Sequence, residues 1–265
     1  VSPVNVESQK ASVQTKLNKL NMLTVRPTII DADIVKILIS CVFKYNENAT
    51  QYSNGELVTL VTSSINTFDN TNLANFDSVF RHSNLVKAID ETDSAILSNT
   101  CNLRLKKATT ITIAKTLGYT SSFGNALYNP NSGYNAAGGG ITLTTGFYTQ
   151  GDTVNVHYFD DDGNGILRRY YVSSGARVYL DSSAGTVDYT NGKITINAIN
   201  ITSTVNTDST IDFTVIPAGN DVVASRGNLI DIAPADVKVT GEVDTIASGE
   251  SSAGVGYTST SSSTY

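Results

Sequence analysis

Charged side chains are scarce in this chain, at 16% of its 265 residues, and tryptophan is absent. The polar surface must therefore come largely from serine, threonine and asparagine, which favour strands, turns and helix caps over helix interiors. Only two cysteines are present, which excludes the disulfide-dense class of small secreted scaffolds. The length is enough to bury the core of one large domain or of two ordinary ones. Composition thus favours a folded, β-rich protein.

Basic runs and long apolar runs are missing as well. The densest basic group lies within residues 104–107, and the net charge is −6. Nucleic-acid binders usually carry a basic face, because contacts with phosphate supply most of their affinity. The longest apolar stretch, 34–43, is interrupted by Lys36 and Ser40 and is too short to cross a bilayer. The sequence therefore predicts neither a nucleic-acid partner nor a membrane partner.

Motifs of enzyme chemistry are absent from the sequence. Gly-x-Ser-x-Gly does not occur, and neither glycine-rich segment is followed by the Gly-Lys-Ser/Thr of a phosphate-binding loop. His82 and His157 are far apart in sequence, which disfavours a metal site between them. We predict no catalytic residue, no cofactor and no small-molecule substrate, and hence no enzyme. A hydrolase is kept as an alternative only because carboxylates are abundant.

The two cysteines, Cys41 and Cys101, fall in predicted strands. Cysteine is among the residue types most often buried, so two buried free thiols are the favoured interpretation. A disulfide is the alternative if the two strands are neighbours.

The pattern along the chain predicts an α+β fold in four parts. Residues 1–27 are interpreted as a linker or the end of a preceding region, with one short amphipathic helix over 11–23. Residues 28–110 form a small α/β layer domain, and residues 111–247 form a β-rich antiparallel domain. Residues 248–265 are predicted to be an extended tail, because ten of these 18 residues are Ser or Thr and cannot bury a core.

The α/β domain is predicted as strand, helix, helix, strand. Residues 29–45 and 97–106 alternate apolar and polar side chains, which indicates two half-buried strands. Between them, Ser-Asn-Gly-Glu at 53–56 fits a capping box at the start of an amphipathic helix. Residues 70–75 are predicted as a polar break that ends this helix. Residues 76–80 are predicted as one helical turn, and Ser83 as the cap of a further helix.

The β-rich domain is predicted from short alternating strands separated by turn residues. Asn191-Gly192 between two β-type runs is a strong hairpin signal. The acidic run 160–165 indicates the turn of another hairpin, because Asp, Asn and Gly tolerate positive φ. Further strands are predicted around Phe213 and Val239.

The acidic run also contains weak candidate ligands for a cation. Asp160, Asp162 and Asn164 match the opening of a calcium-binding loop. That loop needs a bidentate glutamate at its twelfth position, where this chain has Tyr171, and it needs flanking helices where strands are predicted. We therefore predict no metal site, with these three residues as weak candidates.

Aromatic residues are the candidates for contacts with other proteins. The chain has 13 tyrosines, and tyrosine offers a large contact area at a low entropic cost, although ordinary strand packing explains them equally well. We predict an interface at Phe76, Arg81, Tyr257 and Tyr265, since aromatic residues and arginine are common interface anchors. Phe80, close by, is expected in the core instead.

Several segments resemble one protein family. They are NGELVTLV at 54–61, NFDSVFRHS at 75–83, LVKAID at 85–90, PAGNDV at 217–222, RGNLI at 226–230 and DVKV at 236–239. Together they resemble the wedge protein of T-even-type contractile phage baseplates, the gene-product-six or baseplate J-like family. The likeness covers residues 28–107 and 209–245, and the middle β region matches less well.

The resemblance implies a structural protein with no catalytic site. Members of that family line the inner ring of the baseplate, pair with a second copy of themselves, and bind other wedge and hub proteins. The implied location is the virion, with assembly in the host cytoplasm. The chain begins with valine and its only methionine is Met22, so we expect it to be the later part of a longer polypeptide.

A second hypothesis comes from a different class of protein. The tyrosine-rich hairpins and the acidic turn would suit a carbohydrate- or cell-surface-binding β module of a phage fibre or adhesin.

Overall fold

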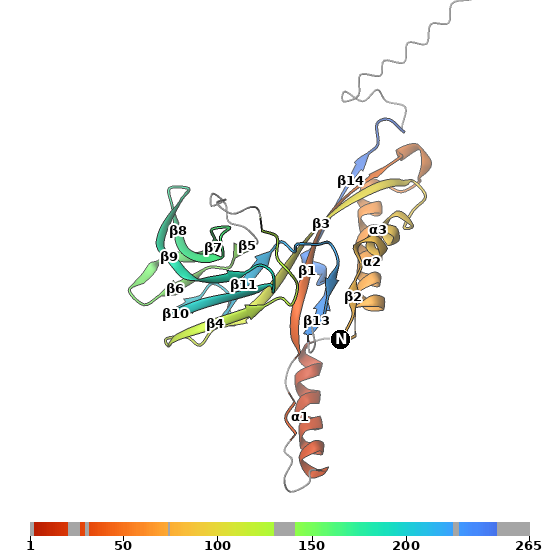
Figure 1. The fold of residues 1–265 in the computed structure, drawn as a ribbon. Coiled ribbons are helices and arrows are strands. Elements are labelled where there is room, and N and C mark those ends of the chain that lie inside the picture. Colours follow the sequence, from red (N-terminus) through yellow and green to blue (C-terminus); the bar gives the residue numbers. More distant parts are fainter. Residues whose placement is uncertain are drawn as a thin grey trace, which may run out of the picture. The chain divides into compact units, whose positions relative to one another are not determined.

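The computed structural model is a mixed α+β structure, with three α-helices and fourteen strands among the residues that it describes (Figure 1). Those residues are 3–20, 27–29, 32–73, 75–129, 141–224 and 228–247. The chain divides into two compact units, Val1–Asp33 and Ile34–Tyr265. The glycine run at 138–140 and the predicted tail at 248–265 lie outside the described residues.

The first unit contains helix α1, Pro3–Leu20. Gln14 ties this helix to the segment that follows: its Nε2 donates to the Pro27 carbonyl at 2.8 Å, and its Oε1 accepts the Ile29 amide at 2.9 Å. The helix predicted over 11–23 is confirmed, although it begins earlier and its predicted end falls outside the described residues.

The first sheet is built on two long antiparallel strands, β1 (Asp33–Tyr45) and β3 (Ile96–Thr110). Its strand order is β13-β1-β3-β11-β5. The sixth strand, β14, is not part of this order and pairs in parallel with residues 39–45 of β1. The shorter strands are β5 (Ile141–Thr144), β11 (Thr210–Val215), β13 (Asn228–Asp231) and β14 (Val237–Val243).

The predicted alternation of β1 is confirmed. Its buried side chains are Val35, Ile37, Ile39, Cys41, Phe43 and Tyr45. Successive side chains of a strand point to opposite faces, so one face of β1 is committed to the core. On β3, Cys101, Leu103 and Leu105 are buried in the same way, while Leu97 is half exposed.

Strands β3 and β11 meet end to start. Thr110 pairs with Thr210, and the Ile111 amide donates to the Ser209 carbonyl at 2.9 Å. Residues 111–209 therefore leave β3 and return to β11 at adjacent positions, and β5 within this stretch also pairs with β11.

Two helices pack on the first sheet. Helix α2 (Asn54–Asn72) contacts β14, and α3 (His82–Asp90) contacts β3 and α2. The predicted capping box is confirmed: the Ser53 hydroxyl accepts the Glu56 amide, and the Glu56 carboxylate accepts the Ser53 amide at 2.8 Å. Helix α2 buries one stripe, Leu57, Val61, Ile65 and Phe68. A short 3₁₀ turn, Glu47–Ala49, lies between β1 and α2.

Helix α2 runs into the residues that were predicted as a polar break at 70–75. It continues to Asn72, and three polar side chains in its last turn donate to carbonyls one turn earlier. Asn70 donates to the Asn66 carbonyl at 2.8 Å, and Asn72 donates to the Phe68 carbonyl at 2.9 Å.

The helical turn predicted over residues 76–80 is wrong. Val79–Phe80 form strand β2, which pairs with β12 (Val222–Val223). Asp77 has a φ of 59°, and this left-handed conformation interrupts any helix. Ser83 does not cap the next helix, since α3 already begins at His82.

The second sheet collects the other strands of the β-rich segment in the order β4-β10-β6-β7-β8-β9, and β10 also pairs with β9. All of its pairings are antiparallel. The strands are β4 (Thr116–Ser122), β6 (Phe147–Thr149), β7 (Asp152–Asp161), β8 (Ile166–Ser173), β9 (Ala176–Asp188) and β10 (Lys193–Thr204). The two predicted hairpin turns are confirmed, after β7 and after β9.

Stacked phenylalanines connect the two sheets. Phe159 of β7 stacks on Phe147 of β6 at 4.7 Å between ring centroids, and on Phe213 of β11 at 6.1 Å. The division of the chain into two domains at 28–110 and 111–247 remains a prediction. Strands from both of these segments lie in the first sheet.

We expect Ser53→Ala to lower the free energy of unfolding by about 1 kcal/mol, because the Glu56 amide loses its acceptor. Chemical denaturation of the full chain measures this. Ser63→Ala is the matched control, an exposed serine inside α2, and it should leave stability unchanged or slightly raised because alanine is the better helix former. Equal losses in both variants would contradict the role of the capping box.

Gly185 allows β9 and β10 to approach closely, because a Cβ at this position would lie 2.0 Å from the Thr195 carbonyl oxygen. We expect Gly185→Ala to cost about 2 kcal/mol of stability through this backbone clash. Gly55→Ala in the first turn of α2 is the control, since its Cβ would meet no atom within 4 Å. Denaturation curves that coincide for the two variants would refute the close approach.

Candidate interaction surfaces

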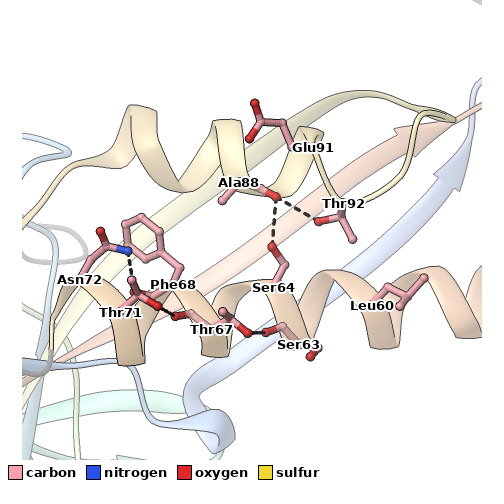
Figure 2. A pocket seen from close by; sticks show the side chains of 10 residues that line it. All are labelled: Leu60, Ser63, Ser64, Thr67, Phe68, Thr71, Asn72, Ala88, Glu91 and Thr92. Carbon is pink, nitrogen blue, oxygen red and sulfur yellow. Dashed lines mark hydrogen bonds between the residues drawn. The ribbon is translucent and has the colours of Figure 1, made fainter.

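A groove runs between α2 and α3 on the helical layer (Figure 2). Its volume is about 440 Å³. The residues that line it are Leu60, Ser63, Ser64, Thr67, Phe68, Thr71, Asn72, Ala88, Glu91 and Thr92. Most of them are small and polar, whereas Phe68 and Leu60 supply apolar surface.

Most polar groups of this groove already have partners within the chain. Figure 2 shows that Ser64 and Thr92 both donate to the Ala88 carbonyl, each at 3.0 Å. The Ser64 bond joins α2 to α3, whereas the Thr92 bond lies at the C-terminal end of α3. Thr67 and Thr71 donate to carbonyls of their own helix. Because these hydroxyls are satisfied, the groove suits the packing of another polypeptide rather than chemistry on a small molecule.

The predicted interface residue Arg81 lies at the N-terminus of α3, where it forms an ion pair. Its NH1 bonds Asp221 Oδ2 at 2.6 Å, and Asp221 Oδ1 accepts the His82 amide at 3.1 Å. Asp221 thus caps a helix that has no local side-chain cap. The Arg81 guanidinium, followed by the His82 amide, holds the pKa of Asp221 below its usual range. The Arg81 side chain is still 56% exposed.

The other predicted interface residues divide into two groups. Phe76 is 59% exposed, which is high for a phenylalanine, and it lies in the turn before β2. Tyr257 and Tyr265 lie outside the described residues. Phe80 is fully buried and packs edge-on against Phe68 at 6.0 Å, so its predicted place in the core is confirmed.

A cluster of arginine and tyrosine surrounds Asp160 on β7, β8 and β9. The Asp160 carboxylate is 4% exposed and accepts from Arg168 Nε at 2.9 Å and from Arg177 NH1 at 2.6 Å. The Tyr179 hydroxyl donates to the same carboxylate at 2.7 Å. Burial, followed by the bond to Asp160, raises the pKa of Tyr179.

The same arginines cover tyrosine rings across the β8–β9 pair. Arg168 lies 4.5 Å from the Tyr179 ring centroid, and Arg177 lies 4.7 Å from that of Tyr170. These contacts occupy ring faces that a sugar would need for stacking. This cluster was not predicted from the sequence, although an arginine and a tyrosine two residues apart on both strands were a detectable signal.

The three candidate cation ligands have separate surroundings. Asp160 is held by the two arginines, whereas Asp162 Oδ1 accepts the amides of Asn164 at 2.7 Å and Ile166 at 3.0 Å. Asp162 therefore shapes the β7–β8 turn, with Gly163 at a φ of 78°. Across the described residues, no three His, Cys, Asp or Glu side chains are grouped as a metal would require.

The described helices include none with the length and apolar character needed to span a membrane.

We expect the contribution of Asp221 to depend on pH. Its folded-state pKa is lowered from an unfolded value of about 3.9, so the stabilisation is present above about pH 4 and is lost as the pH falls through the lowered pKa. Asp221→Asn keeps an acceptor for the His82 amide but removes the charge. Its melting temperature should fall below wild type near pH 7, and the two should converge in acid. Asp212→Asn in β11 is the control, and a gap that is constant with pH would contradict the ion pair.

Comparison with known proteins matches one part of the chain. Residues 34–108 match the family model described as baseplate structural protein gp6, C-terminal domain III. No curated protein matches the chain significantly. The match begins in β1, ends in β3 and includes α2, β2 and α3, so it confirms the resemblance over this layer. Residues 34–108 are therefore similar to a domain of baseplate structural proteins, and this match supports a structural, non-enzymatic role in a phage baseplate.

Proposed function

We propose that this chain is a subunit of the inner wedge ring of a contractile-tail phage baseplate. In this proposal it pairs with a second copy of itself and contacts other wedge and hub proteins. Its place is the virion, and it is assembled in the host cytoplasm. The observation that carries the proposal is the match of residues 34–108 to a baseplate structural domain.

The self-contact is proposed on the matched layer. Phe76 and Arg81 are both more than half exposed and lie on either side of β2. Covering an exposed phenylalanine removes apolar area from water, which contributes about 25 cal/mol per Å² buried. The α2–α3 groove, with its apolar side chains and satisfied hydroxyls, is a second surface on the same layer that a neighbouring subunit would cover.

The C-terminal residues are proposed as a further contact. Ten of the residues 248–265 are Ser or Thr, and Tyr257 and Tyr265 supply aromatic anchors. A segment of this composition gains order from a partner surface rather than from a core of its own. We propose that the two tyrosines contact a neighbouring baseplate subunit.

Light scattering over a concentration series tests the self-pairing. We expect a dimer for the full chain and a dissociation constant raised at least about tenfold by Phe76→Ser, because central aromatic anchors typically carry more than 1 kcal/mol of binding. Tyr128→Ser is the matched control, since Tyr128 is an exposed aromatic residue outside the matched segment.

Arg81 needs its own control because it also pairs with Asp221 within the chain. Arg81→Gln and Asp221→Asn both break the intrachain ion pair, but only Arg81→Gln removes a proposed contact with the second copy. We expect only Arg81→Gln to weaken the dimer. A monomer at every concentration, or equal effects of the two variants, would count against the proposed self-contact. Selective binding on a glycan array, lost on Asp160→Ala, would favour the adhesin hypothesis instead.

A further inference from the structure

The two cysteines face each other across the centre of the first sheet. Cys41 of β1 pairs directly with Cys101 of β3 in the antiparallel register. Both side chains are buried, at 1% and 8% exposure, and both are free thiols. The Cys101 thiol donates to Cys41 Sγ at 2.7 Å. The two sulfur atoms are therefore already in contact and lie on the same face of the sheet.

This placement suits a covalent bond between the strands. Directly opposed residues of an antiparallel pair have Cβ atoms about 4.5–5.5 Å apart, and a disulfide spans Cβ atoms about 3.5–4.5 Å apart. A small approach of the two strands is enough to close the gap. We infer that Cys41 and Cys101 are a modification site, at which a hydroperoxide converts the two thiols of the folded chain into an intrachain disulfide.

The hydrogen bond between the thiols assigns their roles. Because Cys101 donates to Cys41, negative charge is favoured on Cys41, which lowers the pKa of Cys41 and raises that of Cys101. Cys41 is therefore the thiolate that attacks, and Cys101 is the thiol that resolves. Asn99 Oδ1 is a second acceptor for Cys101, at 3.4 Å, and holds that thiol beside its partner.

The reaction balances with a hydroperoxide as the oxidant. The Cys41 thiolate attacks one peroxide oxygen, the O–O bond breaks, and hydroxide leaves and takes up a proton, giving a sulfenic acid on Cys41. The Cys101 sulfur then attacks the Cys41 sulfur, and the S–O bond breaks. The departing oxygen takes the Cys101 proton and leaves as water. Two thiols and one hydrogen peroxide thus become one disulfide and two waters.

The bond would enclose the helical layer. The chain between Cys41 and Cys101 contains α2, β2 and α3, so a disulfide would close these elements into one covalent loop on the two central strands. Cross-linking a long loop restricts the unfolded chain, which stabilises the folded one. The oxidised protein would therefore resist unfolding more strongly than the reduced protein, with the same fold.

Mass spectrometry on the wild-type chain tests the inference. The reduced, folded protein is treated with hydrogen peroxide, quenched, alkylated in denaturant and digested with trypsin without reduction. We expect residues 37–44 to be linked to residues 88–104, the tryptic peptides that contain the two cysteines. We also expect a rise in melting temperature of ~10 °C that dithiothreitol reverses.

Two variants serve as controls for the thermal shift. Cys101→Ala and Cys101→Ser should show no peroxide-dependent rise in melting temperature, whatever their starting stability. The linked peptide of the wild type decides the question without any variant. Two thiols that both remain open to alkylation after peroxide treatment would overturn the inference. So would a sulfinic acid at Cys41 without a linked peptide, or a link between two chains.

Discussion

The apolar face of β1 has exposed fractions of 2% or less at Val35, Ile37, Ile39, Cys41 and Phe43. A shift of β1 by one residue would turn this entire face to solvent, so its burial sets the register of the sheet. The pairing with β3 follows from that register, and β3 in turn positions β11 through Phe213 and Val215. The direct pairing of Cys41 with Cys101 depends on this register as well. So does the packing of α2 and α3 on the sheet.

Features carried by neighbouring residues were predictable from the sequence. The capping box at Ser53, the alternation along β1 and the turn at Asn191-Gly192 each depend on a few residues in a row. Contacts between distant segments gave no such signal. Asp221 caps a helix from 139 residues away, and β2 is a strand only because Val222–Val223 lies beside it. The helical turn expected at 76–80 failed for this reason, since periodicity cannot report a partner that arrives later in the chain.

The surfaces have one property in common, which is that most of their polar groups form hydrogen bonds or ion pairs within the chain. In the groove, the Ser64 and Thr67 hydroxyls donate to helix carbonyls. Arg81 forms an ion pair with Asp221, and Asp160 accepts hydrogen bonds from two arginines and a tyrosine. A surface of this kind presents shape and apolar area to a partner without a reactive group. That character agrees with the structural role that the baseplate family match supports.

Thr110 and Thr210 sit opposite each other, so the intervening stretch of nearly a hundred residues enters and exits the first sheet as a tight hairpin would. One continuous stretch between these two paired residues thus carries every strand of the second sheet together with β5 of the first sheet. Loops in a stretch with adjoining ends can be lengthened or shortened while the register of β3 and β11 is kept, provided that the stretch still supplies β5 to β11 and still covers Phe213. Changes in loop length between these two threonines therefore leave the helical layer on β1 and β3 in place.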